Sequence, residues 1–212
     1  MSQLKLESIR AKGYDFDIQN ILERAWKMFL HQPLLSMAYS MLIFSIQLLS
    51  VLYLGDMAFL FALFLAPPFY SGFYLAANKI SRGETLVYPD FFKGFNYYWS
   101  VFAIWLIGQI ITAIGIFAFI LPGIYLVVAY SFSVLMAIFG GFDFWTALEE
   151  SRKLITVRWW KFLVFTLLLV IINLLGILTL GLGLLISVPI TFYATYLVFE
   201  DITKEVFEEE TA

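Results

Sequence analysis

Long stretches without a charged side chain dominate the sequence. They cover residues 33–55, 57–78, 94–142 and 162–199, and short charged segments separate them. A helix needs about 20 apolar residues to cross a bilayer. The first two stretches can therefore hold one span each, and the last two can hold two each. The pattern predicts an all-α membrane protein with six transmembrane helices, at about 34–54, 57–78, 99–119, 122–140, 161–179 and 182–199.

The composition supports lipid as the solvent of this chain. Hydrophobic residues make up 62% of the 212 positions and charged residues only 14%, whereas a soluble domain is about half apolar and a quarter charged. The chain has no cysteine, which excludes disulfides and thiolate chemistry. No basic patch suits a nucleic acid.

Two segments between the apolar stretches have the pattern of amphipathic helices. They cover residues 17–30 and 143–155, and Asp17 and Asp143 stand where an aspartate caps the first turn. Each helix would place apolar residues on one face and charged residues on the other. Helices of this kind lie in the membrane interface.

The same two segments match each other without gaps at an offset of 126 residues. The shared positions include Phe16-Asp17 and Phe142-Asp143. A looser copy begins at Asp90, so the sequence predicts three parallel repeats of a helix and a hairpin, at about 16–80, 89–140 and 142–200. The alternative is that any capped helix before a span looks alike. We expect residues 1–15 to be a mobile segment, residues 16–200 to form one membrane domain and residues 201–212 to form an acidic tail.

The positive charges fix an orientation for this topology. All 13 Lys and Arg residues fall on one side of a six-span arrangement. The positive-inside rule then places both termini in the cytoplasm. Five of the tryptophans mark the same side, as an aromatic belt would: Trp26, Trp99, Trp145, Trp159 and Trp160.

Several short motifs resemble a known family. They are ILERAWKMF, APPFYSGFYL, RGE, DFFKGF, LPGIYLVV and ALEESRKL, in this order along the chain. Together they resemble the bacterial membrane domain that is fused to some glycerophosphodiester phosphodiesterases, and the related stand-alone inner-membrane proteins. The resemblance implies a multi-pass protein of the bacterial cytoplasmic membrane. It implies no phosphodiesterase activity, because the soluble catalytic domain is missing from this sequence.

Two groups of residues are candidate sites. Basic residues beside the tryptophans could bind anionic lipid headgroups, and topology alone would also explain their charge: Arg152, Lys153, Arg158, Lys161, Trp159 and Trp160. Three prolines within spans, Pro67, Pro68 and Pro189, free backbone carbonyls at membrane depth. They predict kinks, which could be rigid packing features or hinges around a cavity.

Nothing in the sequence predicts catalysis, a cofactor or a metal site. His31 is the only histidine, and the predicted spans contain no ionisable side chain that could couple transport to an ion. A hydrolase would need acids of the cytoplasmic face: Asp90, Asp143, Glu149, Glu150, Glu200 or Asp201. The leading hypothesis is a non-catalytic module that associates with lipids or with another membrane protein. The alternative is a transporter or permease for an apolar or lipid-like solute.

Overall fold

The structure is a computed structural model that describes residues 2–207, and these residues form helices joined by short turns, with no strand. The remainder of the predicted acidic tail, residues 208–212, lies outside the described residues. The helices are α1 (Ser2–Lys12), α2 (Ile18–His31), α3 (Pro33–Leu54), η1 (Gly55–Ala58), η2 (Phe61–Leu65), α4 (Ala66–Ser81), η3 (Tyr88–Tyr97), α5 (Tyr98–Ala118), α6 (Ile120–Ala129), α7 (Ser133–Gly140), α8 (Phe144–Thr156), α9 (Trp159–Leu178) and α10 (Leu184–Phe207).

Five helical stretches of the described residues are long and apolar enough to cross a membrane. This finding agrees with the multi-pass membrane protein that the sequence predicts. The stretches are Pro33–Ala58, Tyr88–Ala118, Ile120–Gly140, Trp159–Leu178 and Leu184–Lys204.

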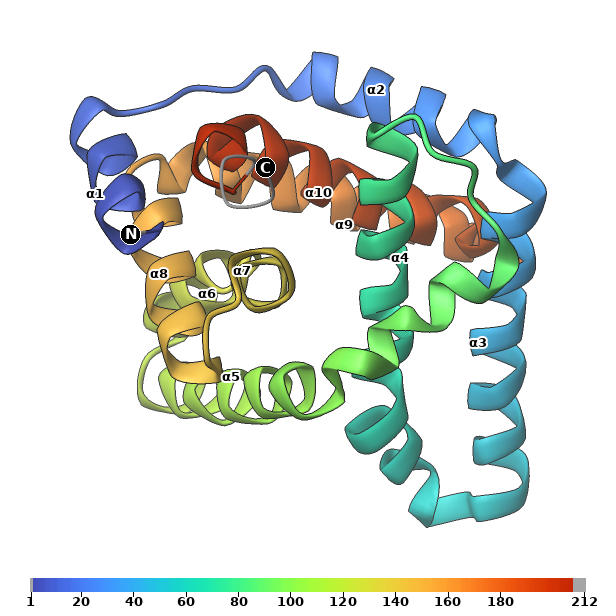
Figure 1. Cartoon of the computed structure of the whole chain (residues 1–212). Helices are drawn as coiled ribbons and strands as arrows, with labels where there is room; N and C mark the ends of the chain where they lie inside the picture. Colours follow the sequence, from blue (N-terminus) through green and yellow to red (C-terminus); the bar gives the residue numbers. More distant parts are fainter. Residues whose placement is uncertain (1, 208–212) are drawn as a thin grey trace.

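The remaining predicted span, residues 57–78, is divided into shorter pieces. Its first half contains η1 and the π-helical η2, and α4 begins only at Ala66. Pro67 and Pro68 occupy the first turn of α4, where a missing backbone N–H breaks no helical hydrogen bond. Helical backbone runs from Phe59 into α4 without a break, and the π-helical turn η2 lies directly before the two prolines, so the helix is irregular where the prolines predict it. This segment still returns alongside α3 and forms a hairpin with it (Figure 1).

The hairpins do not run side by side. In Figure 1 the α3–α4 hairpin stands upright, α2 lies across its upper end, and α9 and α10 run crosswise to it. Helix α10 is the central element, since it contacts α2, α3, α4 and α9. The predicted repeats stay a prediction, because a shared helix-and-hairpin order does not by itself establish a common ancestor.

The helices of the two amphipathic segments begin where their caps predict. The Asp17 carboxylate accepts hydrogen bonds from the backbone N–H groups of Gln19 and Asn20. The Asp143 carboxylate accepts from those of Trp145 and Thr146. Each aspartate thus satisfies N–H groups that the first helical turn leaves free.

The amino-terminal segment differs most from expectation. The sequence predicts mobility for residues 1–15, and the structure places a helix, α1, over most of them. Leu6 of α1 is completely buried, and α1 contacts α8 and α10. Charged contacts described below hold this segment against the rest of the protein.

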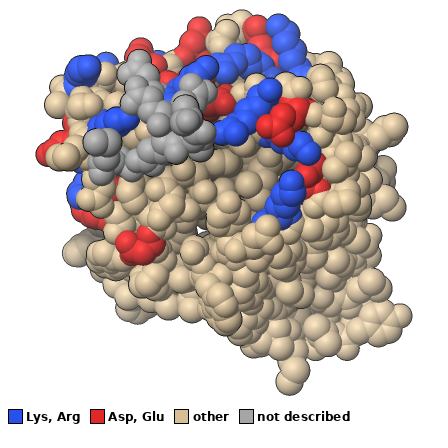
Figure 2. Space-filling view, viewed as in Figure 1, with Lys and Arg blue, Asp and Glu red and all other residues tan. Residues whose placement is uncertain are grey.

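Charged and apolar surfaces are separated. Figure 2 shows Lys, Arg, Asp and Glu side chains gathered over the upper part of the molecule, whereas the lower part, including the tip of the α3–α4 hairpin, presents almost none. Large apolar side chains near the hairpin turns are strongly exposed, among them Phe117 at 95% and Leu180 at 95%. Such an apolar surface suits lipid, not water.

Candidate functional site

The first two basic residues predicted to meet headgroups are engaged within α8. Arg152 donates to the carboxylate of Glu149 from Nε (2.9 Å) and Nη2 (2.7 Å). This pairing raises the pKa of Arg152 and lowers that of Glu149. Lys153 donates from Nζ to Glu150 at 3.1 Å. Both cations therefore have carboxylate partners within the protein itself.

The other two predicted cations bind the amino-terminal segment. Arg158 donates from Nε to the backbone carbonyl of Tyr14 at 3.0 Å. Lys161 forms an ion pair with Asp15, and its Nζ lies 5.1 Å from the centre of the Phe16 ring. The hydrogen bond from Lys161 lowers the pKa of the Asp15 carboxyl.

Two further contacts complete this attachment. Arg10 of α1 forms an ion pair with Glu150, whose side chain is only 6% exposed, and the Tyr14 hydroxyl donates to the carbonyl of Leu154 at 2.7 Å. We call the contacts of residues 10–16 with residues 150–162 the amino-terminal clasp. The clasp uses two of the four basic residues that the sequence assigned to headgroups, Arg158 and Lys161.

The two predicted tryptophans differ in exposure. Trp159 donates from Nε1 to the Tyr125 carbonyl at 3.3 Å and is partly buried, whereas Trp160 is 75% exposed. Their rings stand edge to face, with centroids 4.7 Å apart. Trp160 has the exposure that an aromatic belt at the membrane interface requires.

The predicted proline sites are tightly packed. Pro67, Pro68 and Pro189 are all buried, and Pro189 lies inside one continuous helix, α10. Segment η3 packs directly on the first turns of α4, because a Cβ atom added to Gly94 would lie 2.3 Å from the Pro68 carbonyl oxygen. This close packing favours rigid features over hinges.

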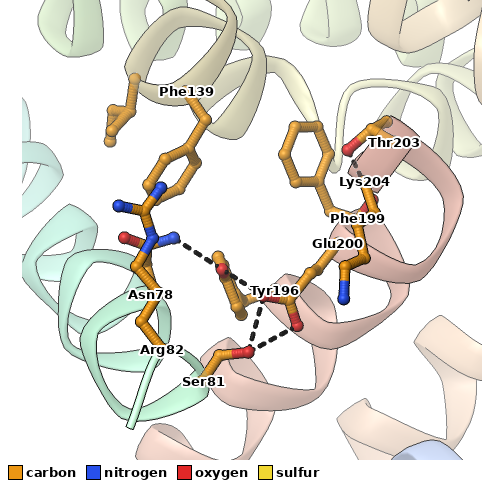
Figure 3. Close-up of a pocket in the computed structure, with 10 residues that line it drawn as sticks. Asn78, Ser81, Arg82, Phe139, Tyr196, Phe199, Glu200, Thr203 and Lys204 are labelled. Atoms are coloured by element: carbon orange, nitrogen blue, oxygen red, sulfur yellow. Dashed lines mark hydrogen bonds between the residues drawn. The ribbon is translucent and has the colours of Figure 1, made fainter. Parts of the chain in front are cut away.

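A cleft that the sequence did not predict lies at the charged end of the helices. Its volume is about 290 Å³, and the carboxyl ends of α4, α7 and α10 surround it (Figure 3). We call it the α4–α10 cleft. Its lining residues are Asn78, Ser81, Arg82, Ile138, Phe139, Tyr196, Phe199, Glu200, Thr203 and Lys204.

A hydrogen-bond network forms one wall of the α4–α10 cleft. Asn78 donates from Nδ2 to the Tyr196 hydroxyl at 2.8 Å, and that hydroxyl donates to Glu200 Oε1 at 2.8 Å. Ser81 donates to the same carboxylate oxygen at 2.6 Å. Tyr196 is only 2% exposed, so it links the two helices in a fixed geometry. The network holds Glu200 at the cleft with a defined orientation.

Arg82 is a cation of this cleft that forms no ion pair with the described residues. Within residues 2–207 it has no ion-pair partner, and Figure 3 shows its side chain extending past Asn78 toward Phe139. The facing wall is aromatic, with the Phe139 and Phe199 rings 6.2 Å apart. The cleft thus combines a free guanidinium with an apolar wall.

Sequence reasoning missed the cleft because its residues come from three distant helices. Tyr196 and Glu200 are spaced for contact on one helix face, which was the one local signal. Nothing in the sequence indicated that α7 would place Phe139 beside α10.

The acidic residues considered for hydrolysis have structural partners. Asp90 binds Lys79 at 2.7 Å and Lys93 at 2.8 Å, and it accepts from the backbone N–H of Val87. Asp201 forms an ion pair with Arg24 at 2.6 Å. Among the described residues, no group of His, Asp or Glu side chains has the arrangement of a metal site.

Comparison with known proteins adds no relative to this description, since no family model, no curated protein and no solved structure matches the chain.

Proposed function

We propose that the protein is a non-catalytic, multi-pass membrane protein that binds the phosphate of a lipid headgroup in the α4–α10 cleft. The observation that carries this proposal is the position of Arg82, a cation without an ion-pair partner beside an aromatic wall. Guanidinium groups bind phosphate through paired hydrogen bonds. The aromatic wall offers the apolar part of the lipid a surface next to that contact.

Charge pairing favours the cleft over three of the four originally predicted basic residues, and the fourth, Arg158, already donates to the Tyr14 carbonyl. Arg152, Lys153 and Lys161 each have a carboxylate partner, so binding a phosphate would require breaking an existing ion pair. Arg82 requires no such exchange. The headgroup proposal therefore moves from α8 and α9 to the end of α4.

Retention of phosphatidylglycerol by the purified protein, measured by native mass spectrometry in a nonionic detergent, tests this proposal. Arg82→Gln should weaken retention by about fivefold, because one basic residue near a headgroup contributes about 1 kcal/mol. Diacylglycerol, which lacks the phosphate, should be retained equally by the variant and the native protein. Both proteins must first elute as single species.

Lys27→Gln is the matched control. Lys27 is an exposed cation of α2 that lies outside the cleft and has no ion pair within the described chain, so its loss should leave retention unchanged. Equal retention by Arg82→Gln and the native protein would contradict the proposal. An equal loss in both variants would show a general charge effect instead of a site.

A transporter for a lipid-like solute is the second candidate. One observation favours it: a second cavity lies close to the cleft. Tyr74, which lines the second cavity, is one helical turn before Asn78 of the cleft, and Thr195, which also lines it, is next to Tyr196 of the cleft. The two cavities share no lining residue and are therefore separate here. Movement of a fluorescent phospholipid between leaflets of vesicles that contain the protein would favour transport.

A further inference from the structure

A second cavity lies among the apolar parts of the helices. Its volume is about 270 Å³, and α4, α9, α10 and the segment just before α7 form its wall. No charged residue lines it. Its lining runs from Phe162 in the first turn of α9 to Asn173, and from Thr191 to Thr195 in the middle of α10. We call it the inner cavity.

Tyr74 is the unusual residue of the inner cavity. Its side chain is 8% exposed, and its hydroxyl has no hydrogen-bond partner in the described part of the chain. Every fully enclosed side-chain nitrogen or oxygen among the described residues does have a partner. The Tyr74 hydroxyl therefore retains some accessible surface, and Tyr74 is one of the residues that line the inner cavity.

Most other polar groups of this wall are already engaged. Asn173 donates to Leu169 and Thr191, and the Thr195 hydroxyl donates to the Thr191 carbonyl. Besides Tyr74, only Thr166 of the polar lining residues lacks a partner within residues 2–207. An unused donor in an apolar pocket is costly unless an acceptor hydrogen-bonds to it.

Aromatic rings form much of the remaining wall. The Phe192 ring stands edge-on to Tyr74 at 5.0 Å between centroids, and Phe132 stands edge-on to Phe162 at 5.2 Å. A cavity of about 150 Å³ is known to hold benzene. The inner cavity is therefore large enough for a fused pair of rings or for the ester region of a lipid.

We propose that the inner cavity binds a neutral, mainly apolar molecule through a carbonyl oxygen that accepts the hydrogen bond of Tyr74. A neutral ligand is required because no charged side chain lines the site, and burying an unpaired charge at this depth is unfavourable. A carbonyl oxygen suits the site because it accepts the hydroxyl hydrogen of Tyr74, for which the described part of the chain supplies no acceptor. Val170, at the edge of the cavity, is 48% exposed, so the ligand can enter from the apolar surface.

Two probes test this inference and distinguish the sources of such a carbonyl. One is 2-methyl-1,4-naphthoquinone, a ring diketone, and the other is 1,2-dioleoylglycerol, a neutral ester lipid. Binding to the purified protein in detergent would be measured by isothermal titration calorimetry. The native protein should bind at least one probe, and the probe that binds identifies a ring ketone or an ester as the ligand class. In the naphthoquinone arm, 2-methylnaphthalene, which lacks carbonyls, should bind more weakly.

Tyr74→Phe removes the donor and keeps the ring. It should weaken binding of the accepted probe by about three- to tenfold, the usual value of one hydrogen bond. Tyr70→Phe is the matched control, since Tyr70 lies one turn earlier on α4 and its ring also contacts Phe192, at 5.4 Å, yet it does not line the cavity. Binding by neither probe, or equal binding by Tyr74→Phe and the native protein, would overturn the inference.

Discussion

The amino-terminal clasp and the α4–α10 cleft lie at the same charged end of the molecule and use their basic residues differently. In the clasp, Arg10 and Lys161 each face a carboxylate. In the cleft, Arg82 has no ion pair within the described chain. The Glu200 carboxylate of the cleft instead accepts hydrogen bonds from Ser81 and Tyr196. The comparison distinguishes basic residues that already face a carboxylate from one that does not.

The same contacts explain why the segment from α1 to Asp15 packs against the rest of the protein. A short segment of mixed charge cannot bury enough apolar surface to fold alone. Here its charges meet complementary charges of α8 and α9, and Leu6 enters the core. Each exposed pair contributes little, but the Arg10–Glu150 pair is largely shielded from water, which makes it the dominant contact of the clasp.

Removing Glu150 should break the clasp and cause the largest loss of stability. Glu150→Ala leaves Arg10, which is 18% exposed, without its partner, and removing one member of a buried pair costs about 3 kcal/mol or more. The thermal unfolding midpoint in detergent should fall clearly. Faster proteolysis within residues 1–15 should accompany it.

Glu149→Ala is the matched control for that loss. Glu149 is the neighbouring carboxylate of α8, 36% exposed, and its main partner is Arg152. An exposed pair contributes about 1 kcal/mol at most, so this variant should unfold close to the native midpoint. Equal destabilisation by the two variants would remove the distinction between the buried contact and the exposed one.

Neutralising the four cations that the sequence assigned to headgroups should reduce stability less than Glu150→Ala does. It should have little effect on the retention of phosphatidylglycerol. The variant combines Arg152→Gln, Lys153→Gln, Arg158→Gln and Lys161→Gln. Three ion-paired cations and a hydrogen bond from Arg158 are lost, which should reduce the free energy of unfolding by about 2 kcal/mol in total. Retention of phosphatidylglycerol should match the native protein, because Arg82 remains. Loss of retention here, with retention intact in Arg82→Gln, would reassign the headgroup site to α8 and α9.

Much of the helix placement could be predicted from the sequence, since it depends on local signals. The lack of charge defines α3, α5 and α9 to within about two residues of their predicted limits, and Asp17 and Asp143 mark the starts of the two amphipathic segments. Pro67 and Pro68 predict an irregularity within residues 57–78, and the π turn η2 lies directly before them, but the position of η3 against this helix was harder to predict. The two segments approach closely at Gly72, where an added Cβ atom would lie 1.9 Å from the Phe91 carbonyl oxygen, and no local pattern indicates that contact.

The candidate sites were less predictable than the helices. Sequence shows which residues are basic, but it does not show which carboxylates they meet. Lys161 is 146 residues away from Asp15 along the chain, and Tyr196 is 118 residues from Asn78. The crosswise arrangement of α9 and α10 against the α3–α4 hairpin brings such residues together (Figure 1), and no local pattern encodes that arrangement.

The smallest expected effect is a pH dependence of the Arg152–Glu149 pair. The hydrogen bond from Arg152 lowers the pKa of Glu149 in the folded protein, so the folded state binds the proton of this group less readily than the unfolded state does. The resulting stabilisation is complete above the ordinary glutamate pKa, about 4.3, and is lost as the pH falls through the lowered folded value. Because the pair is exposed, the contribution is about a few tenths of a kcal/mol after solvent screening.

Unfolding midpoints measured between pH 6 and pH 3 would detect this contribution. The midpoint of the native protein should fall more steeply below pH 4 than that of Glu149→Gln, because glutamine cannot titrate. Asp15 and Asp143 also have lowered pKa values, so both proteins should retain some acid sensitivity, and only the difference between their slopes reports on Glu149. Identical slopes would show that Arg152 is not held by Glu149 in solution, and Arg152 would then join Arg82 as a cation free to meet a headgroup.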